Sequence, residues 1–209
     1  MLYFVGTPIG NLEDLSPRAV RTLREVDAIG AEDTRHTLRL LTHFDIHTPL
    51  FSFHQHNERQ RTDEIVARLH AGESIAIVSD AGMPLVSDAG SLLAARLRSE
   101  SIAFTCVPGP SAADTALVLS GLPSESFLFL GFVPREARQQ DVFFETVLKS
   151  SHTVICFESP RRIVPTLQKL RDLNPERLVA VARELTKIHE ETLRGPVTDV
   201  LKTLSERGE

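Results

Sequence analysis

Three segments of the chain place small residues, prolines and hydrogen-bonding groups directly after a short apolar run. They are Val5–Asn11 (Val-Gly-Thr-Pro-Ile-Gly-Asn), Ser79–Gly90 and Val107–Ala112 (Val-Pro-Gly-Pro-Ser-Ala). Glycine allows positive φ angles and a close approach of the backbone to a ligand. In open α/β sheets, ligands bind just beyond the carboxyl ends of strands. The three loops together predict a shared ligand site, although each loop alone also fits a structural turn.

The second loop contains the tetrapeptide Ser-Asp-Ala-Gly twice. The first copy, Ser79–Gly82, follows the apolar run Ile75–Val78 and predicts a ligand contact through Asp80. The second copy, Ser87–Gly90, precedes another apolar run and predicts a helix start. No loop matches G-x-G-x-x-G or G-x-x-x-x-G-K-[ST], and no lysine follows a glycine loop. A nucleoside triphosphatase and a dinucleotide-dependent oxidoreductase are therefore disfavoured.

A fourth segment, Gly30–Thr37, places two acids, an arginine and a histidine after a short apolar run. Asp33 is a candidate general base, since a positioned carboxylate can take a proton from a reacting hydroxyl. Arg35 is a candidate phosphate ligand, because its guanidinium can form two parallel hydrogen bonds. The alternative is structural: Asp33 or Thr34 caps a helix, where acids also favour the positive end of the helix dipole.

Short apolar runs alternate with stretches of helical periodicity along the whole chain. The expected strands are Leu2–Val5, Ala28–Ala31, Leu50–Phe53, Ser74–Val78, Ile102–Val107, Phe127–Phe132, Thr153–Phe157 and Leu178–Ala182. The first expected helix begins at Pro17, after the cap Ser16. The next is expected over Thr34–His43, with Leu38, Leu40 and Leu41 facing inward. The others span Glu58–His70, Ser91–Arg98, Ser111–Leu119, Ala137–Lys149, Arg162–Leu173 and Val197–Ser205. This alternation predicts the α/β class.

A stretch rich in Pro, Gly and Ser, from residue 108 to residue 123, divides the chain. We therefore expect two α/β domains, residues 1–110 and residues 120–209, with a ligand cleft between them. Cys106 and Cys156 lie in apolar, strand-like runs and are expected to be buried and unpaired. His54 and His56 have a spacing that zinc could use, but no cysteine lies near them, so no metal site is expected.

Composition limits the partners. The formal net charge of −5 argues against indiscriminate nucleic-acid binding, and no apolar run is long enough to span a membrane. A cytoplasmic protein is expected. Six of the eight histidines lie between residues 36 and 70, interleaved with arginines, but nearby acids almost balance them. This stretch fits either a mixed-charge surface or a local basic face.

Seven motifs occur in the same order as in a known family. They are Gly6–Leu12 (Gly-Thr-Pro-Ile-Gly-Asn-Leu), Ala31–Thr37 (Ala-Glu-Asp-Thr-Arg-His-Thr), Val78–Gly82 (Val-Ser-Asp-Ala-Gly), Pro108–Ala112 (Pro-Gly-Pro-Ser-Ala), Gly121–Pro123 (Gly-Leu-Pro), Phe157–Pro160 (Phe-Glu-Ser-Pro) and Ala182–Lys187 (Ala-Arg-Glu-Leu-Thr-Lys). In these motifs the chain resembles the ribosomal RNA small subunit methyltransferase I family of the tetrapyrrole methylase superfamily.

The resemblance implies two α/β domains of the tetrapyrrole methylase type, with S-adenosyl-L-methionine in the cleft between them. It implies 2′-O-methylation of a cytidine ribose in the decoding region of 16S rRNA within the 30S subunit. It also implies a homodimer, with no membrane or DNA partner. By analogy with the superfamily, the cofactor contacts are Pro8, Asp80, Ala81, Gly82, Met83, Ser111, Ala112, Phe157, Glu158 and Leu185.

The chain departs from the family pattern at two positions. Met83 stands where the family usually has threonine, and Ala89 where it usually has proline. The loss of the hydroxyl at residue 83 removes one possible cofactor hydrogen bond, worth on the order of 1 kcal/mol. The family also continues past Glu209 with a strand and a small helical domain, so the chain is expected to be truncated.

Within the family mechanism, positioning supplies most of the rate, Asp33 is expected to act as the base and Arg35 to hold an RNA phosphate. Two other functions stay open. One is methylation of a tetrapyrrole precursor on the same fold, and the other is a non-catalytic nucleotide- or RNA-binding module.

Overall fold

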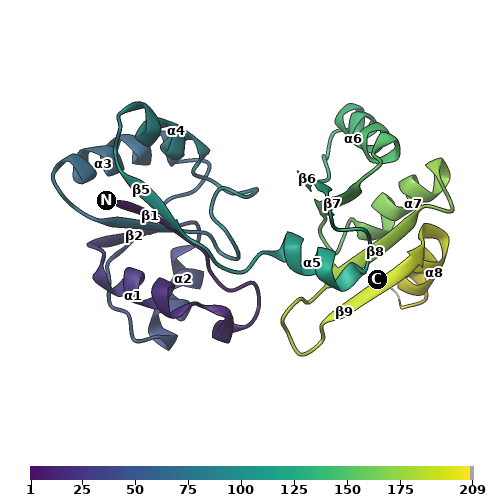
Figure 1. Ribbon diagram of the computed structural model, residues 1–209, viewed down its shortest axis with the longest axis horizontal. Coiled ribbons are helices and arrows are strands. Elements are labelled where there is room, and N and C mark those ends of the chain that lie inside the picture. The colour runs from purple at the N-terminus through teal and green to yellow at the C-terminus, as the bar shows by residue number, and fades with distance from the viewer. Residues whose placement is uncertain (208–209) are drawn as a thin grey trace. The chain divides into compact units, whose positions relative to one another are not determined.

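The computed structural model describes residues 1–207 and divides into two compact units, Met1–Ser111 and a second unit that begins at Ala112 (Figure 1). Each unit has its own hydrophobic core. Residues 208 and 209 lie outside the described residues. No helix in the described part of the chain is both long and apolar enough to cross a membrane.

A parallel five-stranded sheet forms the centre of the first unit. Its strands lie in the order β3-β2-β4-β1-β5 and are β1 (Leu2–Val5), β2 (Ala28–Ala31), β3 (Leu50–Ser52), β4 (Ile75–Val78) and β5 (Phe104–Val107). The connecting helices are the short 3-10 helix η1 (Leu12–Asp14), α1 (Pro17–Glu25), α2 (Thr34–His43), α3 (Glu58–His70) and α4 (Ser91–Ser99). In Figure 1, α1 and α2 cover one face of this sheet and α3 and α4 the other.

The apolar pattern of the strands explains this layering. All four residues of β4 are buried, because helices cover both faces of the sheet. On one face, Val78 packs in a cluster with Leu23 of α1 and Leu41 of α2. On the other face, Ile77 belongs to a second cluster that includes residues of α3 and α4. Alternate residues of each strand therefore contribute to opposite faces of one core.

The order of the strands creates a topological switch point between β1 and β4. The chain leaves β1 toward β2 and leaves β4 toward β5, so the connections after these two neighbours run in opposite directions. In doubly wound sheets, ligands bind at the carboxyl edge beside such a point. The first two glycine-containing loops, which follow β1 and β4, both begin there.

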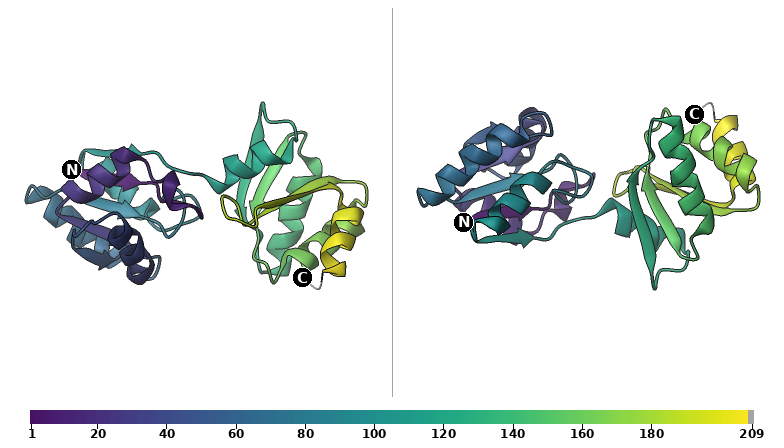
Figure 2. Two further views of the ribbon diagram at one scale, coloured as in Figure 1. Left: turned by 90° about the horizontal axis from the view of Figure 1, so that it is seen from below. Right: turned by 90° about the horizontal axis from the view of Figure 1, so that it is seen from above.

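The second unit contains two small sheets. β6 (Phe127–Phe132) pairs in parallel with β7 (Thr153–Phe157), and β8 (Leu178–Arg183) pairs antiparallel with β9 (Glu191–Pro196). Figure 2 shows α5 (Ala112–Ser120) on one side of these strands, and α6 (Ala137–Lys149), α7 (Ile163–Leu173) and α8 (Val197–Glu206) on the other. The helix predicted at 111–119, inside the proposed junction, is α5, and it lies against β7, β8 and β9.

The α/β class is confirmed, and β1, β2, α2, α3, β6, α6 and β7 have the predicted bounds. Three expectations were wrong. β9 was not predicted, because only Leu193 in it is strongly apolar. Leu38 was expected to face inward but is 56% exposed, since Thr37, Leu40 and Leu41 form the buried face of α2. Cys106 and Cys156 were expected to be buried but are exposed, because successive side chains of a strand alternate in direction and the neighbouring Val107 and Ile155 take the buried side.

Candidate active site

The first two glycine-containing loops are joined by backbone hydrogen bonds at the switch point. The N–H of Thr7 donates to the carbonyl of Gly82 at 2.9 Å, and the N–H of Gly82 donates back to Thr7 at 3.1 Å. The buried hydroxyl of Thr7 also donates to the carbonyl of Ser79 at 3.1 Å. The two loops therefore form one rigid platform beyond the ends of β1 and β4.

The third loop packs backbone to backbone against the first. A Cβ atom added to Gly6 would lie 2.7 Å from the Cα of Gly109, and one added to Gly109 would lie 2.8 Å from the carbonyl carbon of Gly6. Real Cβ atoms do not approach backbone so closely, so both positions require glycine. The structure thus brings together the three loops that the sequence predicted to share a site.

Met83 lies beside this glycine pair. Its Sδ accepts a hydrogen bond from the backbone N–H of Gly109 at 3.3 Å. The same sulfur would lie 2.7 Å from a Cβ at Gly6. The thioether of Met83 therefore connects the second loop to the third. On the neighbouring loops, Ala81 is exposed and Pro8 is half-buried.

Asp33 caps α2, as the structural alternative predicted. Its Oδ1 accepts hydrogen bonds from the backbone N–H groups of Arg35 at 2.8 Å and His36 at 3.4 Å. Its Oδ2 lies 3.3 Å from the guanidinium of Arg35, whose side chain is 90% exposed. The hydrogen bonds from Arg35 hold the pKa of Asp33 below its usual value. Asp33 is therefore ionised at neutral pH, which makes it able to accept a proton but only a weak base.

Asp80 connects this cap to the switch point. Its Oδ1 accepts a hydrogen bond from the backbone N–H of Asp33 at 3.0 Å, which ties the loop after β4 to the loop after β2. Asp80 and the Asp33–Arg35 pair, which the sequence placed in two separate motifs, are therefore neighbours at one edge of the sheet.

A cluster of carboxylates surrounds Asp80. Burial, followed by the charges of Glu32 and Asp80, raises the pKa of Asp88 to about 6. Burial and the charge of Asp80 also raise the pKa of Glu32, and the nearby His54 opposes that shift. Sequence analysis assigned Asp88 to a helix start and missed this proximity. Among residues 1–207, no three His, Cys, Asp or Glu side chains are arranged to hold a metal ion.

The far end of the second loop is held by Glu58, the first residue of α3. Its Oε1 accepts hydrogen bonds from the backbone N–H groups of Gly90 and Leu92, both at 2.9 Å. Gly90 precedes α4 with a φ of 125° and supplies no capping side chain, so Glu58 caps that helix from outside. Leu85 and Ser87 also have positive φ angles, of 72° and 67°. The loop is therefore strained and anchored at both ends, which sets the position of Asp88.

The remaining predicted cofactor residues lie at the end of the first unit or in the second. Ser111 ends the first unit, and Ala112 begins α5. Phe157 ends β7, and its ring packs edge-on against Phe129 at 5.0 Å between ring centroids. Leu185 lies on a different loop, after β8.

Glu158, which directly follows β7, has its side-chain oxygens bound within the second unit. Its side chain is only 4% exposed and lies 3.4 Å from the guanidinium of Arg162. Its two oxygens accept hydrogen bonds from the backbone N–H of Ser159 and the hydroxyl of Thr166. This carboxylate therefore holds the start of α7.

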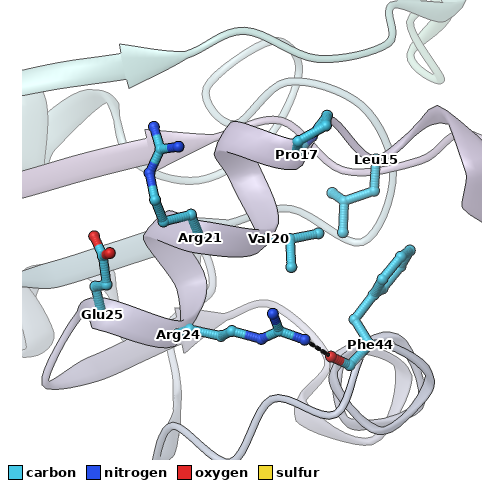
Figure 3. A pocket seen from close by; sticks show the side chains of 7 residues that line it. All are labelled: Leu15, Pro17, Val20, Arg21, Arg24, Glu25 and Phe44. Atoms are coloured by element: carbon cyan, nitrogen blue, oxygen red, sulfur yellow. Dashed lines mark hydrogen bonds between the residues drawn. The ribbon is translucent and has the colours of Figure 1, made fainter.

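A pocket of about 420 Å³ lies along α1 and not at the carboxyl edge of the sheet (Figure 3). It is lined by Leu15, Pro17, Val20, Arg21, Arg24, Glu25 and Phe44. The guanidinium of Arg24 closes one end by donating to the carbonyl of Phe44 at 2.5 Å (Figure 3). None of the predicted site residues lines this pocket.

Comparison with known proteins places this geometry in a family. A family model described as tetrapyrrole (corrin/porphyrin) methylases matches residues 1–201. Two relatives, both named ribosomal RNA small subunit methyltransferase I, come from Halalkalibacterium halodurans and Thermotoga maritima. The first is 48% identical over 96% of this chain and 69% of its own length, and the second is 45% identical over 96% and 90%.

Solved structures support the same fold. A cobalt precorrin-4 methyltransferase matches with a TM-score of 0.72 at 15% identity, over 99% of this chain and 90% of its own. A diphthine synthase matches with a TM-score of 0.75 at 16% identity, over 96% and 84%. The resemblance found in the sequence motifs is thereby confirmed. The chain belongs to the tetrapyrrole methylase family of methyltransferases, in the branch of ribosomal RNA small subunit methyltransferase I.

Proposed function

We propose that this methyltransferase uses S-adenosyl-L-methionine to methylate the 2′-oxygen of a cytidine ribose in the decoding region of 16S rRNA, within the 30S subunit. The observation that carries the proposal is the 45–48% identity, over 96% of the chain, to relatives named ribosomal RNA small subunit methyltransferase I. An rRNA substrate would place the enzyme in the cytoplasm.

The first unit fits such a cofactor chemically. Glycines at positions 6 and 109 let the first and third loops pack backbone to backbone at the switch point, which brings both loops to the same edge of the sheet. The carboxylates of Glu32, Asp80 and Asp88 suit a ligand that carries an ammonium, a sulfonium and ribose hydroxyls. Asp80 is our main candidate among them. Pro8, Ala81, Gly82, Met83, Ser111, Ala112, Phe157, Glu158 and Leu185 stay predicted contacts.

When bound, S-adenosyl-L-methionine supplies an electrophilic methyl group on a sulfonium. The chain must align the ribose 2′-oxygen with that methyl, and alignment supplies most of the rate. A carboxylate of the chain would take the hydroxyl proton as the oxygen–carbon bond forms and the methyl–sulfur bond breaks, with the bonding electron pair passing to sulfur. Asp33 is the first candidate for this base, and Arg35 holds an RNA phosphate next to it. Asp88 is the second candidate, because its raised pKa makes it the stronger base.

The test is mass mapping of 2′-O-methyl groups in 30S rRNA incubated with the protein and the cofactor. One new methyl group on a cytidine ribose is expected. No methylation, with the cofactor bound, would favour a non-catalytic module, and methylation of a precorrin-type substrate instead would favour a tetrapyrrole enzyme.

Two variants test the assigned residues. Asp33→Asn keeps an acceptor for capping α2 but removes the charge, so turnover should fall while cofactor affinity stays unchanged. If Asp33→Asn retains turnover and Asp88→Asn does not, Asp88 is the base. Asp80→Ala should weaken cofactor binding measured by calorimetry, and an unchanged affinity removes Asp80 from the site.

A homodimer is also part of the proposal. The second unit exposes large apolar side chains on several elements, and such surfaces are typical of protein contacts. They include Val118, Phe132, Val142 and Ile188. Sedimentation equilibrium should give the mass of a dimer, and a monomer at micromolar concentration would reject this part.

A further inference from the structure

Two polar side chains at the carboxyl edge of the first sheet have unused hydrogen-bonding atoms. Glu32, which directly follows β2, is half-buried, and its carboxylate makes no hydrogen bond or ion pair among residues 1–207. His54, which follows β3, is also half-buried, and its Nδ1 is buried without a hydrogen-bond partner. Buried polar groups in proteins are usually hydrogen-bonded. Both side chains therefore keep a hydrogen-bonding capacity that no residue in the described part of the chain uses.

Sheet pairing places these two side chains next to each other. The parallel strands β2 and β3 are paired up to their last residues, and the N–H of Phe53 donates to the carbonyl of Ala31 at 2.8 Å. Glu32 and His54 are the next residues on the two segments after this last hydrogen bond. Burial and the charge of Asp80 raise the pKa of Glu32, and the charge of His54 opposes that rise, as expected of near neighbours.

Asn57 fixes the backbone that carries His54. Its Oδ1 accepts a hydrogen bond from the backbone N–H of His54 at 2.8 Å, and its own N–H donates to the carbonyl of His54 at 3.0 Å. Its side-chain amide also donates to the carbonyl and the hydroxyl of Ser52, at 3.2 and 3.1 Å. The turn after β3 is therefore closed before any ligand binds, so little backbone entropy is lost in positioning His54.

The surroundings of the His54 ring decide which nitrogen carries the proton of the neutral imidazole. A neutral imidazole has one donor and one acceptor nitrogen. Nδ1 is buried without an acceptor, and buried N–H groups that lack an acceptor are rare in proteins. We therefore assign the proton to Nε2, which is not among the buried unpaired atoms and makes no hydrogen bond within residues 1–207. Glu32 and His54 thus supply one acceptor and one donor from adjacent segments.

The position of this pair separates it from the three glycine-containing loops. Those loops follow β4, β1 and β5, whereas Glu32 and His54 follow β2 and β3, at the other end of the sheet order. Asp80, after β4, lies between the two groups and accepts the N–H of Asp33. A cofactor held by the glycine-containing loops would leave the ends of β2 and β3 to the substrate that accepts the methyl group.

We propose that Glu32 and His54 bind the base of the target nucleotide and select cytosine over uracil. This inference rests on the proposed function and deepens it. Cytosine has an amino donor at N4 beside an acceptor at N3, which match the carboxylate of Glu32 and the Nε2–H of His54. Uracil has an acceptor at O4 and a donor at N3, so it would place like against like at both contacts. A site that hydrogen-bonds its substrate rejects such an analogue, because its polar groups are left unpaired.

The test compares Glu32→Gln with the control Glu25→Gln, because Glu25 is an exposed acid on α1 that forms no hydrogen bond or ion pair among residues 1–207. Methyl transfer is measured on 30S subunits that carry the mapped target nucleotide either as cytidine or as uridine. A glutamine amide can present either its oxygen or its amino group, so Glu32→Gln should lower the cytidine-to-uridine ratio of kcat/KM by roughly tenfold. His54→Phe, which keeps a ring but loses both nitrogens, should also lower the ratio, and Glu25→Gln should leave it unchanged.

Two results on these variants would overturn the proposal. One is an unchanged cytidine-to-uridine ratio in Glu32→Gln. The other is weaker binding of S-adenosyl-L-methionine to Glu32→Gln, measured by calorimetry. The carboxylate would then hold the cofactor, whose adenine has the same order of amino donor and ring acceptor as cytosine.

Binding of free nucleotides separates this inference from the proposed function. Cytidine monophosphate and uridine monophosphate are titrated into the unmodified protein and Glu32→Gln, and amide NMR shifts give both affinities. The unmodified protein should bind the cytidine nucleotide more tightly, with shifts at Glu32 and His54, and Glu32→Gln should lose this preference. If 30S subunits are not methylated but the preference holds, the proposed function fails and the inference stands. Equal affinities, or no shifts at these two amides, reject the inference even when methylation is found.

Discussion

Glu58→Ala should loosen the second glycine-containing loop without touching any ligand. The Oε1 of Glu58 accepts two backbone hydrogen bonds, from Gly90 and Leu92, each at 2.9 Å. Hydrogen bonds to a charged group contribute roughly 1.5–3 kcal/mol each when protected from water. The bond from Gly90 is partly buried and the bond from Leu92 is exposed, so water replaces the second at little cost. We therefore expect a loss of about 2 kcal/mol for the pair.

Native-state hydrogen exchange measures this loss at the amides themselves. A change of about 2 kcal/mol corresponds to roughly 30-fold faster exchange at Gly90 and Leu92. The same loss lowers Tm by roughly 4–8 °C for a chain of this length. Glu58→Gln keeps an oxygen acceptor and loses only the charge, so about half of the effect should remain.

Asp63→Ala is the matched control, because Asp63 is an exposed acid on the same helix and makes no hydrogen bond among residues 1–207. If Glu58→Ala changes exchange at the two amides no more than Asp63→Ala does, the carboxylate is not the cap of α4, and the account of this loop is wrong.

Three further predictions concern the same edge of the sheet. Asp88, whose pKa is raised to about 6 from 3.8, binds its proton more tightly in the folded state, so its contribution to stability is full below pH 3.8 and is lost as pH rises through 6. Asp88→Asn should remove this fall in the free energy of unfolding, which is on the order of 1 kcal/mol after solvent screening. If urea unfolding gives the same pH dependence for the variant and the unmodified protein, the prediction is wrong. Gly109→Ala should cost about 1–3 kcal/mol through its 2.8 Å backbone clash, whereas Gly195→Ala, with nothing closer than 3.9 Å, should leave Tm nearly unchanged. Met83→Leu should keep the volume but lose a weak acceptor, so exchange at the Gly109 amide should rise about twofold; unchanged exchange would mean that the 3.3 Å contact does not protect it.

Local patterns were sufficient to predict most of the elements. Apolar runs of four residues, as in β1 and β4, are too short for helices, and buried strands need no alternation. Ser16 and Asp33 were both identified as caps or possible caps, and both accept hydrogen bonds from the first turns of their helices. β9 was missed because its sequence, Glu-Thr-Leu-Arg-Gly-Pro, lacks a strand signal and is stabilised by pairing with β8.

The site was predicted in its parts but not in its connections. The sequence indicated Asp80 and the three loops, because strand-loop-helix junctions with glycine are visible locally. It did not indicate Asp88 as a neighbour of Glu32 and Asp80, or Glu58 as the cap of α4. Glu58 lies 32 positions before Gly90, and Asp88 lies 56 positions after Glu32, and nothing in a local pattern encodes contacts at such separations.

The sequence by itself therefore determined the class of the fold, the strand-end loops and, through seven ordered motifs, the family. Only the tertiary structure decided which carboxylates share one edge, that the helix-cap role predicted for Asp33 holds, and how Met83 joins two loops. The physical reason is that secondary structure follows from periodicity over a few residues, whereas pKa values and close packing depend on groups that meet only when β2, β4, β1 and β5 align in the sheet.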